Sequence, residues 1–384
     1  MRILNTLYYY RPHFSGLTVY TERLARMLVS RGHQVTVLTS QYERSLLPLE
    51  IMDGVEVRRV PVAFKVSKGP IMPTFLYWAA RLIPEYDLLH LHVPQLEAAP
   101  LSLLGRAFGK PVVLTYHCDL LLPPSPLNAV ANQFSNLANS ISTKNANAII
   151  VNSGDYAEES PLLSRKLEKI EEIPPPIEMP EPDTAIVQSM RERFNIAPGD
   201  AVIGMAARLA TEKGAEVLAQ AMPIVLKEFP NARVLYVGQY EKVMGEEAYF
   251  LRLLPQIEAL GDHWTFLGIL QQSEFAAFFS LCDVTVLPSL NSTESFGMVQ
   301  VESMLSGTPV VASDLPGVRQ PTQSTGMGLT FPPGDVNELA AALLQVLNNP
   351  TDYTRDRASV MAQYSSDVVA DKYETIFATL ISRA

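Results

Sequence analysis

The sequence predicts an α/β protein made of two separate Rossmann-like domains. Near the start, an apolar strand at Ile3–Tyr9 precedes a helix and a second strand, QVTVLTS. The same order recurs from Ala201, where the strand AVIGMAA precedes a loop, a helix and the strand NARVLYVG. A strand-helix-strand unit pairs its strands in parallel and is the building block of a doubly wound sheet. At 384 residues the chain exceeds the size that one hydrophobic core usually organises. We therefore expect two domains.

The first domain is predicted from helical and strand periodicity. Tyr20, Leu24 and Met27 recur at helical spacing, and Gly32 is suited to end this helix in the left-handed conformation. Three later apolar runs, DLLHLHV, KPVVLTYH and AIIVNS, are predicted strands of the same sheet. His90 and His92 lie on the same face of the first of these strands. We interpret both as structural, because no third metal ligand is near in sequence.

The second domain follows a proline-rich segment, IEEIPPPIEMPEPD at Ile170–Asp183, which is the predicted linker because its five prolines disfavour a helix. We place the first domain at residues 1–175 and the second at 176–363. Three more apolar runs, HWTFLG, DVTVLPS and TPVVAS, are predicted strands of the second domain. The terminal helix at 364–384 needs a packing partner, because it carries an apolar face formed by Val369, Tyr373, Ile376 and Leu380.

Composition limits the classes of partner. The net charge of −10 argues against nucleic acid as the main partner, because such binding needs a basic surface. Cys118 and Cys282 belong to no CxxC or zinc-like cluster, so a reducing cytoplasm fits best. The longest uncharged span, Leu120–Thr143, is too polar and proline-rich to cross a membrane. Within it, a helix at Leu127–Ile141 is expected to pack on the protein's own core through Val130, Phe134 and Leu137; the alternative is a membrane surface.

The stretch NSTESFGMVQVE points to ligand binding. Glu294 and Glu302 flank Gly297 where a helix, predicted to end at Gly307, should begin after a buried strand. The first N–H groups of such a helix attract anions, and a glycine lets a phosphate approach the backbone. Two carboxylates beside a phosphate are compatible with a sugar nucleotide, if each faces a hydroxyl-bearing part of it. Alternatively, Glu294 only complements the helix dipole and Glu302 is a solvated helix residue.

The loop RLATEKG supplies two cations near the same predicted edge. Arg208 directly follows a buried strand, and Lys213 opens the next helix. Arginine can bind a diphosphate with directional hydrogen bonds, and lysine can bind it as a point charge. Surface salt bridges with Glu212 and Glu216 are the alternative interpretation.

Taken together, these motifs resemble the retaining glycosyltransferases of the GT-B fold, specifically glycosyltransferase family four, once called glycosyl transferases group 1. The resemblance rests on ESFGMVQVE followed by SMLSGTPVVAS, on AARLATEKG and on VLPS. It also rests on SGLTVYTERLARMLVSRGHQVTVLT near the start, on LHLHVP and on LTYHCDL. These motifs span most of the chain in family order. The fold this implies has two Rossmann-like domains facing each other across a cleft, with the terminal helix crossing back to the first domain.

The resemblance also implies residue roles. Arg208 and Lys213 resemble the pair that grips the donor diphosphate, and Glu302 resembles the glutamate that binds the ribose. Glu294 resembles the group that holds the hydroxyls of the transferred sugar. It would act together with the backbone amides of Phe296, Gly297, Met298 and Val299.

Further implied positions lie outside this stretch. His117 resembles the family's histidine near the reaction centre, and Gly16 its loop glycine beside the donor phosphates. The backbone at Ile269 would meet the base. The chain departs from the family at Gly238, where VGxG reads VGQY, at Gly16-Leu17 instead of a glycine pair, and at IPPPIE instead of a glycine-bearing hinge. No cofactor or metal is implied, because cations and helix N-termini would stabilise the leaving diphosphate.

The function this implies is that of a retaining, metal-independent hexosyltransferase in the cytoplasm. It would use a UDP- or GDP-sugar donor and a glycan, lipid-linked or small-molecule acceptor. Apolar stretches at PTFLYWAARLIP and DLLLPPSPL could face a lipid-linked acceptor or a membrane surface, and a buried core explains them equally well. Two other functions stay open: a GT-B sugar-nucleotide epimerase, and a noncatalytic subunit that binds a nucleotide or glycan.

Overall fold

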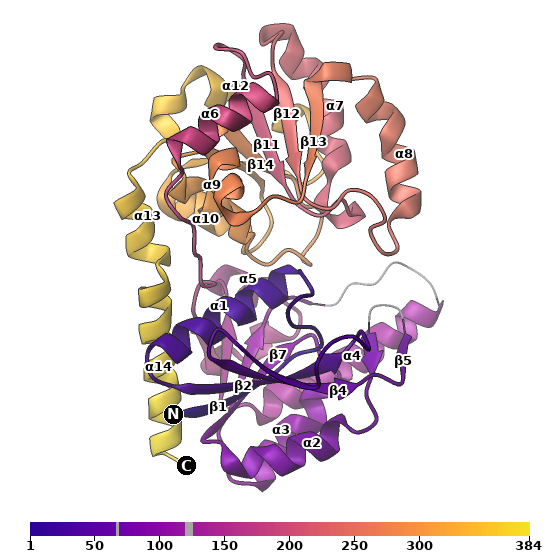
Figure 1. Ribbon diagram of the computed structural model, residues 1–384, viewed down its shortest axis with the longest axis vertical. Coiled ribbons are helices and arrows are strands. Elements are labelled where there is room, and N and C mark those ends of the chain that lie inside the picture. Colours follow the sequence, from indigo (N-terminus) through magenta and orange to yellow (C-terminus); the bar gives the residue numbers. More distant parts are fainter. Residues whose placement is uncertain (67–68, 120–125) are drawn as a thin grey trace. The chain divides into compact units, whose positions relative to one another are not determined.

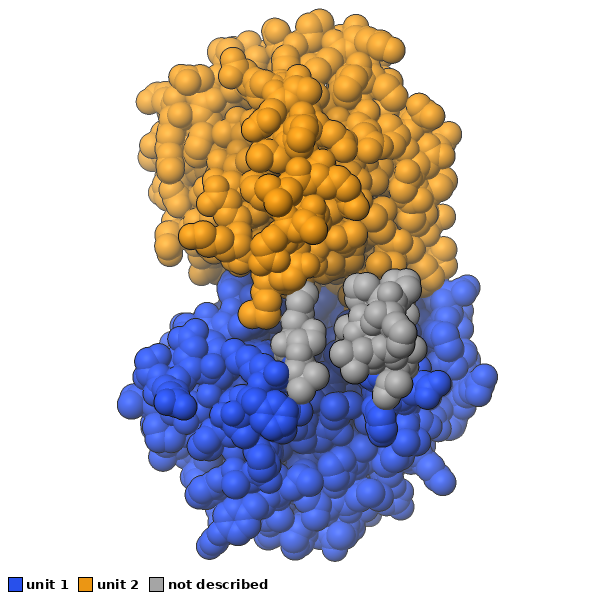
Figure 2. All heavy atoms as spheres, turned by 90° about the vertical axis from the view of Figure 1, so that its right-hand side faces the viewer, with its two compact units in different colours: residues 1–176, 366–384 blue, residues 177–365 orange. Residues whose placement is uncertain are grey.

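The computed structural model describes residues 1–66, 69–119 and 126–384. The chain forms two compact units, coloured blue and orange in Figure 2. Unit 1 comprises Met1–Pro176 and Ser366–Ala384, and unit 2 comprises Ile177–Ser365. Most of the predicted apolar stretch DLLLPPSPL lies outside the described residues.

Unit 1 contains an eight-stranded sheet in the order β10-β9-β8-β7-β1-β2-β4-β3 (Figure 1). Its neighbouring strands are parallel except for β3 and β4, which are antiparallel. The strands are β1 (Arg2–Thr6), β2 (Gln34–Gln41), β3 (Leu49–Met52), β4 (Val55–Pro61), β7 (Leu88–Val93), β8 (Val112–Tyr116), β9 (Ala148–Val151) and β10 (Ile170–Glu172). A separate two-stranded antiparallel sheet pairs β5 (Phe64–Val66) with β6 (Gly69–Ile71).

The helices of unit 1 lie between these strands in sequence, except for α14, which ends the chain. The first begins where the Ser15 hydroxyl accepts a hydrogen bond from the Thr18 amide, and Gly32 follows its end at φ +87°, as predicted. The helices are α1 (Gly16–Ser30), α2 (Phe75–Leu82), α3 (Ala98–Ala107), α4 (Pro126–Asn145), α5 (Gly154–Glu159) and α14 (Ser366–Ser382).

Helix α4 packs through a different face from the one predicted. Phe134 and Leu137 are 63% and 57% exposed, so the prediction that they join the core is wrong; the Val130 side chain lies outside those described. The buried face, which includes Ser135, Asn139 and Ser142, is small and polar. Short polar side chains can be buried here because they find hydrogen-bond partners: the Ser142 hydroxyl donates to the Asn139 carbonyl, and the Asn139 side-chain amide donates to the Tyr116 hydroxyl of β8. Among the described helices, none is long and apolar enough to span a bilayer.

The predicted linker is partly a strand. Ile170–Glu172 pairs in parallel with β9 as β10, so assigning these three residues to a linker was wrong. An edge strand tolerates two exposed glutamates, because one of its sides faces solvent. The rest of the segment forms no helix until α6 (Thr184–Arg193), whose first turn is capped by the Asp183 carboxylate.

Unit 2 contains a six-stranded, wholly parallel sheet in the order β13-β12-β11-β14-β15-β16. Its strands are β11 (Val202–Ala206), β12 (Arg233–Val237), β13 (Trp264–Gly268), β14 (Val284–Leu287), β15 (Val310–Ser313) and β16 (Gly328–Phe331). Its helices are α6 (Thr184–Arg193), α7 (Ala215–Glu228), α8 (Glu247–Glu258), α9 (Gln272–Leu281), α10 (Met298–Leu305), α11 (Arg319–Thr325), α12 (Val336–Asn348) and α13 (Arg357–Tyr364).

Strand alternation divides the core of unit 2 into two layers. Ile203 and Met205 of β11 pack with residues of α7 and α12 on one face of the sheet. Val202 and Ala206 pack with residues of α9 and α10 on the other face. Because both faces are covered, the strands are almost continuously apolar, and binding groups are left to the loops at the strand ends.

Helix α14 is anchored to unit 1 through a buried polar contact. Tyr373 is completely buried, and its hydroxyl lies 2.5 Å from the Tyr20 hydroxyl of α1 and 3.2 Å from Thr115 Oγ1 of β8. Val369 is buried as predicted, and Phe377, which the sequence analysis did not single out, is also completely buried.

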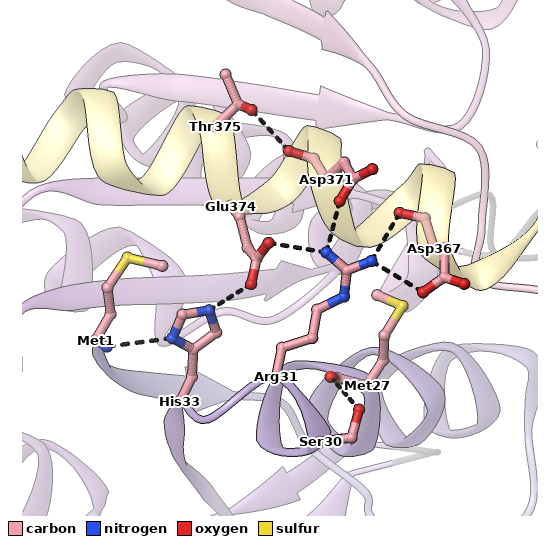
Figure 3. A network of polar contacts seen from close by, with 9 residues as sticks. All are labelled: Met1, Met27, Ser30, Arg31, His33, Asp367, Asp371, Glu374 and Thr375. Carbon is pink, nitrogen blue, oxygen red and sulfur yellow. Dashed lines mark hydrogen bonds and ion pairs between the residues drawn. The ribbon is translucent and has the colours of Figure 1, made fainter.

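An ionic network at the surface supplements this anchor (Figure 3). The Arg31 guanidinium of α1 donates to Asp367, Asp371 and Glu374 of α14 at 2.9, 2.6 and 2.9 Å. Burial opposes ionisation of Glu374, but hydrogen bonds from His33 and Arg31 outweigh it and lower its pKa. The resulting stabilisation is complete above pH 4.5, the ordinary pKa of a glutamate, and is lost as the pH falls through the lowered pKa.

We expect Tyr373→Phe to lower the free energy of unfolding of unit 1 by about 1–2 kcal/mol, because it removes the hydroxyl that joins Tyr20 to Thr115 in a buried site. Urea unfolding followed by fluorescence, together with amide hydrogen exchange of α14, measures the loss. Lys372→Ala, at an exposed position of the same helix, is the control and should leave both unchanged. Unfolding of Tyr373→Phe at the same urea concentration as the unmodified chain would contradict the anchoring role.

Candidate functional site

The loops of unit 2 that carry the predicted site residues meet at the point where the strand order reverses. Strand β11 has β12 on one side and β14 on the other, and all three are parallel. Connections from β11 and β14 therefore leave the same edge in opposite directions, which opens a place for a ligand at the carboxyl ends of the strands. Arg208 and Lys213 lie on the β11 connection, and Glu294 lies on the β14 connection.

Lys213 and Glu294 form an ion pair at this point. Lys213 Nζ lies 2.5 Å from Glu294 Oε2, although the residues are 81 positions apart in sequence. Their side chains are 23% and 17% exposed, so the pair is partly shielded but still reaches solvent. The expected alternative partner of Lys213, Glu216, instead accepts a hydrogen bond from the Tyr249 hydroxyl.

Arg208 is held only loosely. Its guanidinium donates to Glu212 Oε1 at 3.0 Å, with the arginine side chain 42% exposed, which is the surface pair that the sequence analysis gave as an alternative. Such an exposed pair contributes about 0–1 kcal/mol, so an anion of higher charge could displace it. Arg208 and the Lys213–Glu294 pair thus lie on two connections that leave the same edge of the sheet.

Helix α10 begins at Met298 with Gly297 as its N-cap, next to the start predicted from the sequence. Gly297 has φ +78°, and a Cβ placed on it would lie 2.3 Å from Leu287 Cδ2 of β14. The left-handed backbone favours a glycine here, and the close approach of helix and strand adds to that preference, both independently of any ligand. The ring of Phe296 is buried against Tyr364, so only its backbone is available to a ligand. Met298 and Val299 occupy the first turn of α10, where N–H groups have no partner within the helix.

Glu302 is buried rather than solvated. It lies in the second turn of α10 and is 4% exposed, so the interpretation of Glu302 as a solvated helix residue is wrong. Its neighbours Gln300 and Ser303 are completely buried as well. The side-chain amide of Gln300 donates to the backbone carbonyls of Phe296 and Val318, each at 2.8 Å. These bonds stabilise the start of the helix. Burial of a carboxylate is costly unless it has polar partners, which marks Glu302 as a specifically placed group.

Two glycines allow the backbones of neighbouring loops to pack closely against each other. A Cβ on Gly214, at φ +67°, would lie 2.0 Å from the Pro288 carbonyl oxygen of the β14 loop. A Cβ on Gly238, at φ +129°, would lie 2.1 Å from the Ala207 carbonyl oxygen of the β11 loop. The amide of Leu290 donates to the Glu212 carbonyl at 2.9 Å and ties the β11 and β14 loops directly. Ile269 follows β13 with its side chain 71% exposed, at the same edge of the sheet.

The remaining predicted residues, His117 and Gly16, belong to unit 1. Gly16 is the exposed first residue of α1. His117 directly follows β8 and is 8% exposed; its Nε2 lies 3.0 Å from His92 Nδ1, and the Tyr20 ring meets it edge-on. Burial lowers the pKa of His117 to about 3, so its imidazole is neutral. The sequence analysis did not connect Tyr20 or His92 with His117; strand alternation in LHLHVP followed by LTYH was the available signal.

His90 has the structural role expected of it. Its Nε2 lies 2.7 Å from Thr115 Oγ1 on the adjacent strand, and burial lowers its pKa to about 3. Within residues 1–66, 69–119 and 126–384, no three His, Cys, Asp or Glu side chains are grouped as a metal site would require.

We expect Gly214→Ala to destabilise unit 2 by about 2–4 kcal/mol, because it adds a clash with Pro288 to the strain of a left-handed residue. Thermal unfolding measures the effect. Gly261→Ala is the matched control: Gly261 also has positive φ, +55°, but a Cβ there would meet nothing within 4 Å. Gly261→Ala should show only the smaller cost of backbone strain. Equal losses of stability for the two variants would contradict a steric clash between position 214 and Pro288.

Known proteins resemble this chain over nearly its whole length. Residues 187–365 match the family of Glycosyl transferases group 1, and residues 15–176 match the Glycosyl transferase 4-like domain. A phosphatidyl-myo-inositol mannosyltransferase of Mycobacterium leprae is 28% identical over 372 residues, which cover 95% of this chain and 93% of that protein. A D-inositol 3-phosphate glycosyltransferase of Acidothermus cellulolyticus is 27% identical over 364 residues, covering 87% and 78% respectively.

Solved structures share the fold. Sucrose-phosphate synthase of Thermosynechococcus elongatus has a TM-score of 0.77 at 22% identity and covers 100% of both chains. Anabaena HepE, in complex with UDP and glucose, has a TM-score of 0.79 at 20% identity, covering 99% of this chain and 100% of that one. With two Rossmann-like sheets, these likenesses define the chain as a glycosyltransferase of the GT-B fold. It belongs to the family of glycosyl transferases group 1, which the sequence motifs had indicated.

Proposed function

We propose that this chain is a retaining, metal-independent glycosyltransferase that moves a hexose from a nucleoside diphosphate sugar to a glycan, lipid-linked or small-molecule acceptor. The observation that carries the proposal is the Lys213–Glu294 pair at the strand-order reversal of unit 2. A cation and a carboxylate held 2.5 Å apart offer one group for a diphosphate and one for the hydroxyls of the attached sugar. In this proposal unit 2, at 177–365, binds the donor and unit 1 serves the acceptor.

Each predicted residue has a role in donor binding. Lys213 replaces its contact to Glu294 with one to the diphosphate, and Arg208 leaves Glu212 to do the same. Glu302 holds the ribose, and Ile269 meets the base. Backbone amides at the start of α10, from Phe296 to Val299, assist Glu294 with the sugar. Gly238 shapes the loop beside them. For Gly16 and His117 of unit 1, the proposed roles are those that the family resemblance implies.

The proposed reaction needs charge stabilisation more than proton transfer by the protein. The bond between the anomeric carbon and the diphosphate breaks, and its electron pair leaves with the nucleoside diphosphate. The acceptor oxygen bonds to the same carbon from the same face, and its proton passes to the leaving group. Lys213, Arg208 and the first amides of α10 stabilise the charge that develops on the diphosphate. UDP- and GDP-sugars are the candidate donors, and HepE, whose structures contain UDP and UDP-glucose, supports a uridine donor.

A polyol acceptor carried on a lipid fits unit 1 best. Relatives of the chain act on phosphatidyl-myo-inositol and on D-inositol 3-phosphate by name. An open groove of about 540 Å³ lies between α2 and α3, where Leu76, Tyr77 and Leu103 are 37%, 55% and 52% exposed. Arg81 and Arg106 lie on the same two helices and would face anionic headgroups. We therefore propose peripheral contact with the cytoplasmic face of a membrane, a reducing compartment that suits the unbridged cysteines Cys118 and Cys282.

A donor and acceptor screen tests the proposal. Purified protein is incubated with UDP- and GDP-hexoses, with and without phosphatidylinositol vesicles or free inositol phosphate, in the presence of EDTA. We expect nucleoside diphosphate to be released only when an acceptor is present, with retention of the anomeric configuration in the product. Release without an acceptor together with a changed sugar would instead show the epimerase, and tight binding without turnover of any donor would show the noncatalytic subunit.

A further inference from the structure

His92 of β7 adjoins His117 in a fully packed part of unit 1. His92 Nδ1 lies 3.0 Å from His117 Nε2, and the two rings stack with their centroids 5.3 Å apart. His117 is 8% exposed, whereas His92 is completely buried. His92 therefore cannot touch a ligand, and any influence that it has on the reaction must pass through His117.

One hydrogen bond joins the two rings, and either ring could be its donor. Burial lowers the pKa of both imidazoles far below neutrality, so each ring is neutral and carries a single N–H. The short contact then needs one ring as donor and the other as acceptor. If His92 donates from Nδ1, the remaining N–H of His117 is at Nδ1. If His117 donates from Nε2, its Nδ1 is a bare acceptor and His92 carries its proton at Nε2.

Thr21 of α1 distinguishes these two arrangements. Its Oγ1 lies 3.5 Å from His92 Nδ1 and donates its own hydrogen to the Leu17 carbonyl at 3.0 Å. A hydroxyl has one proton to give, so towards His92 it can only accept. The position of Thr21 thus favours a proton on Nδ1 of His92.

The surroundings of the other ring nitrogen, His92 Nε2, also favour a proton on His92 Nδ1. His92 Nε2 is buried, and none of the residues that the structure describes is its hydrogen-bond partner. An unpaired buried N–H is rarer and less favourable than an under-satisfied acceptor, because the donor loses its water without replacement. A bare Nε2 on His92 is therefore the better arrangement, which again places the His92 proton at Nδ1.

We propose that His92 is a positioning residue that donates from Nδ1 to His117 Nε2 and thereby keeps the His117 proton on Nδ1, where it is a hydrogen-bond donor to a substrate oxygen. This inference rests on the proposed function, since glycosyl transfer is what brings a hydroxyl or phosphate oxygen to His117. The Tyr20 ring, edge-on at 4.7 Å and 90°, restrains the imidazole plane. Without His92, the His117 proton could move to Nε2 and the ring would face the substrate with an acceptor.

Two replacements of His92 separate positioning from packing. His92→Asn places an amide N–H near the former Nδ1 but leaves a void, whereas His92→Leu fills the space but donates nothing. A role in positioning predicts that His92→Leu lowers kcat about tenfold or more and that His92→Asn restores most of it. A role in packing predicts the opposite order, because the void is then the greater defect. Turnover of His92→Leu at or above that of His92→Asn would overturn the proposal.

Nitrogen-15 NMR of histidine-labelled protein reads the proton position directly and needs no substrate. We expect the His117 proton on Nδ1 in the unmodified chain and in His92→Asn, and on Nε2 in His92→Leu. The control is His90→Gln, which keeps a polar group near Thr115 and should leave the His117 signal unchanged. A proton on Nε2 of His117 in the unmodified chain refutes the inference. Absence of turnover with every donor refutes the proposed function instead, so the two failures are distinguishable.

Discussion

Lys213→Ala is expected to lower kcat at least about 100-fold, because it removes the charge that neutralises the departing diphosphate. It also leaves Glu294, only 17% exposed, facing that diphosphate without a counter-charge. Both effects act against the leaving group, and both should also weaken binding of the free nucleoside diphosphate. Initial rates at saturating donor and calorimetric titration with UDP and GDP measure the two losses.

The fold should tolerate this change. The pair with Glu294 is partly exposed and joins two loops that are already tied by the Leu290 to Glu212 backbone bond. Thermal unfolding should therefore be nearly unchanged. Lys227→Ala, at an exposed position in the last turn of α7, removes the same charge elsewhere and should leave turnover unaffected. Normal turnover of Lys213→Ala would refute the assignment of the site.

Glu294→Gln is expected to lower kcat by about 100-fold. In contrast to Lys213→Ala, it should strengthen binding of the product, the free nucleoside diphosphate. The amide keeps the size of the carboxylate, but it loses the negative charge that binds sugar hydroxyls most strongly. The same loss frees Lys213 and removes a repulsion next to the diphosphate, so binding of free UDP or GDP should become tighter. Turnover and calorimetric titration on one preparation measure both effects.

The opposite signs make this test decisive between a ligand site and a structural ion pair. If the pair served only to join the two loops, breaking it from either side would weaken nucleotide binding alike. Weaker binding of the nucleoside diphosphate by Glu294→Gln would therefore count against Glu294 as the sugar-binding group. Glu258→Gln at the exposed end of α8 is the matched control, with turnover and binding expected to match the unmodified chain.

Local patterns were sufficient for most of the scaffold. The helical spacing through Met27, the left-handed glycine at Gly32 and the start of α10 next to Gly297 were each predicted and are confirmed. They were accessible because periodicity and helix ends depend on residues only a few positions apart. Strands β3 to β6 and β16 were not predicted, and β10 was assigned to a linker. Edge strands such as β10 have one unpartnered side, so their sequences carry less of the apolar signal.

The amino-acid sequence alone determined that two α/β units would present acidic, basic and glycine residues on loops at the carboxyl ends of parallel strands. Which side chains meet was decided by the tertiary structure: Lys213 pairs with Glu294 instead of Glu216, Glu302 is buried, and Phe134 is exposed. The same holds for Gly214, whose need for a glycine comes from Pro288 on another loop. These outcomes depend on the packing of segments far apart in the chain. Contacts of that range leave no periodic trace in either segment.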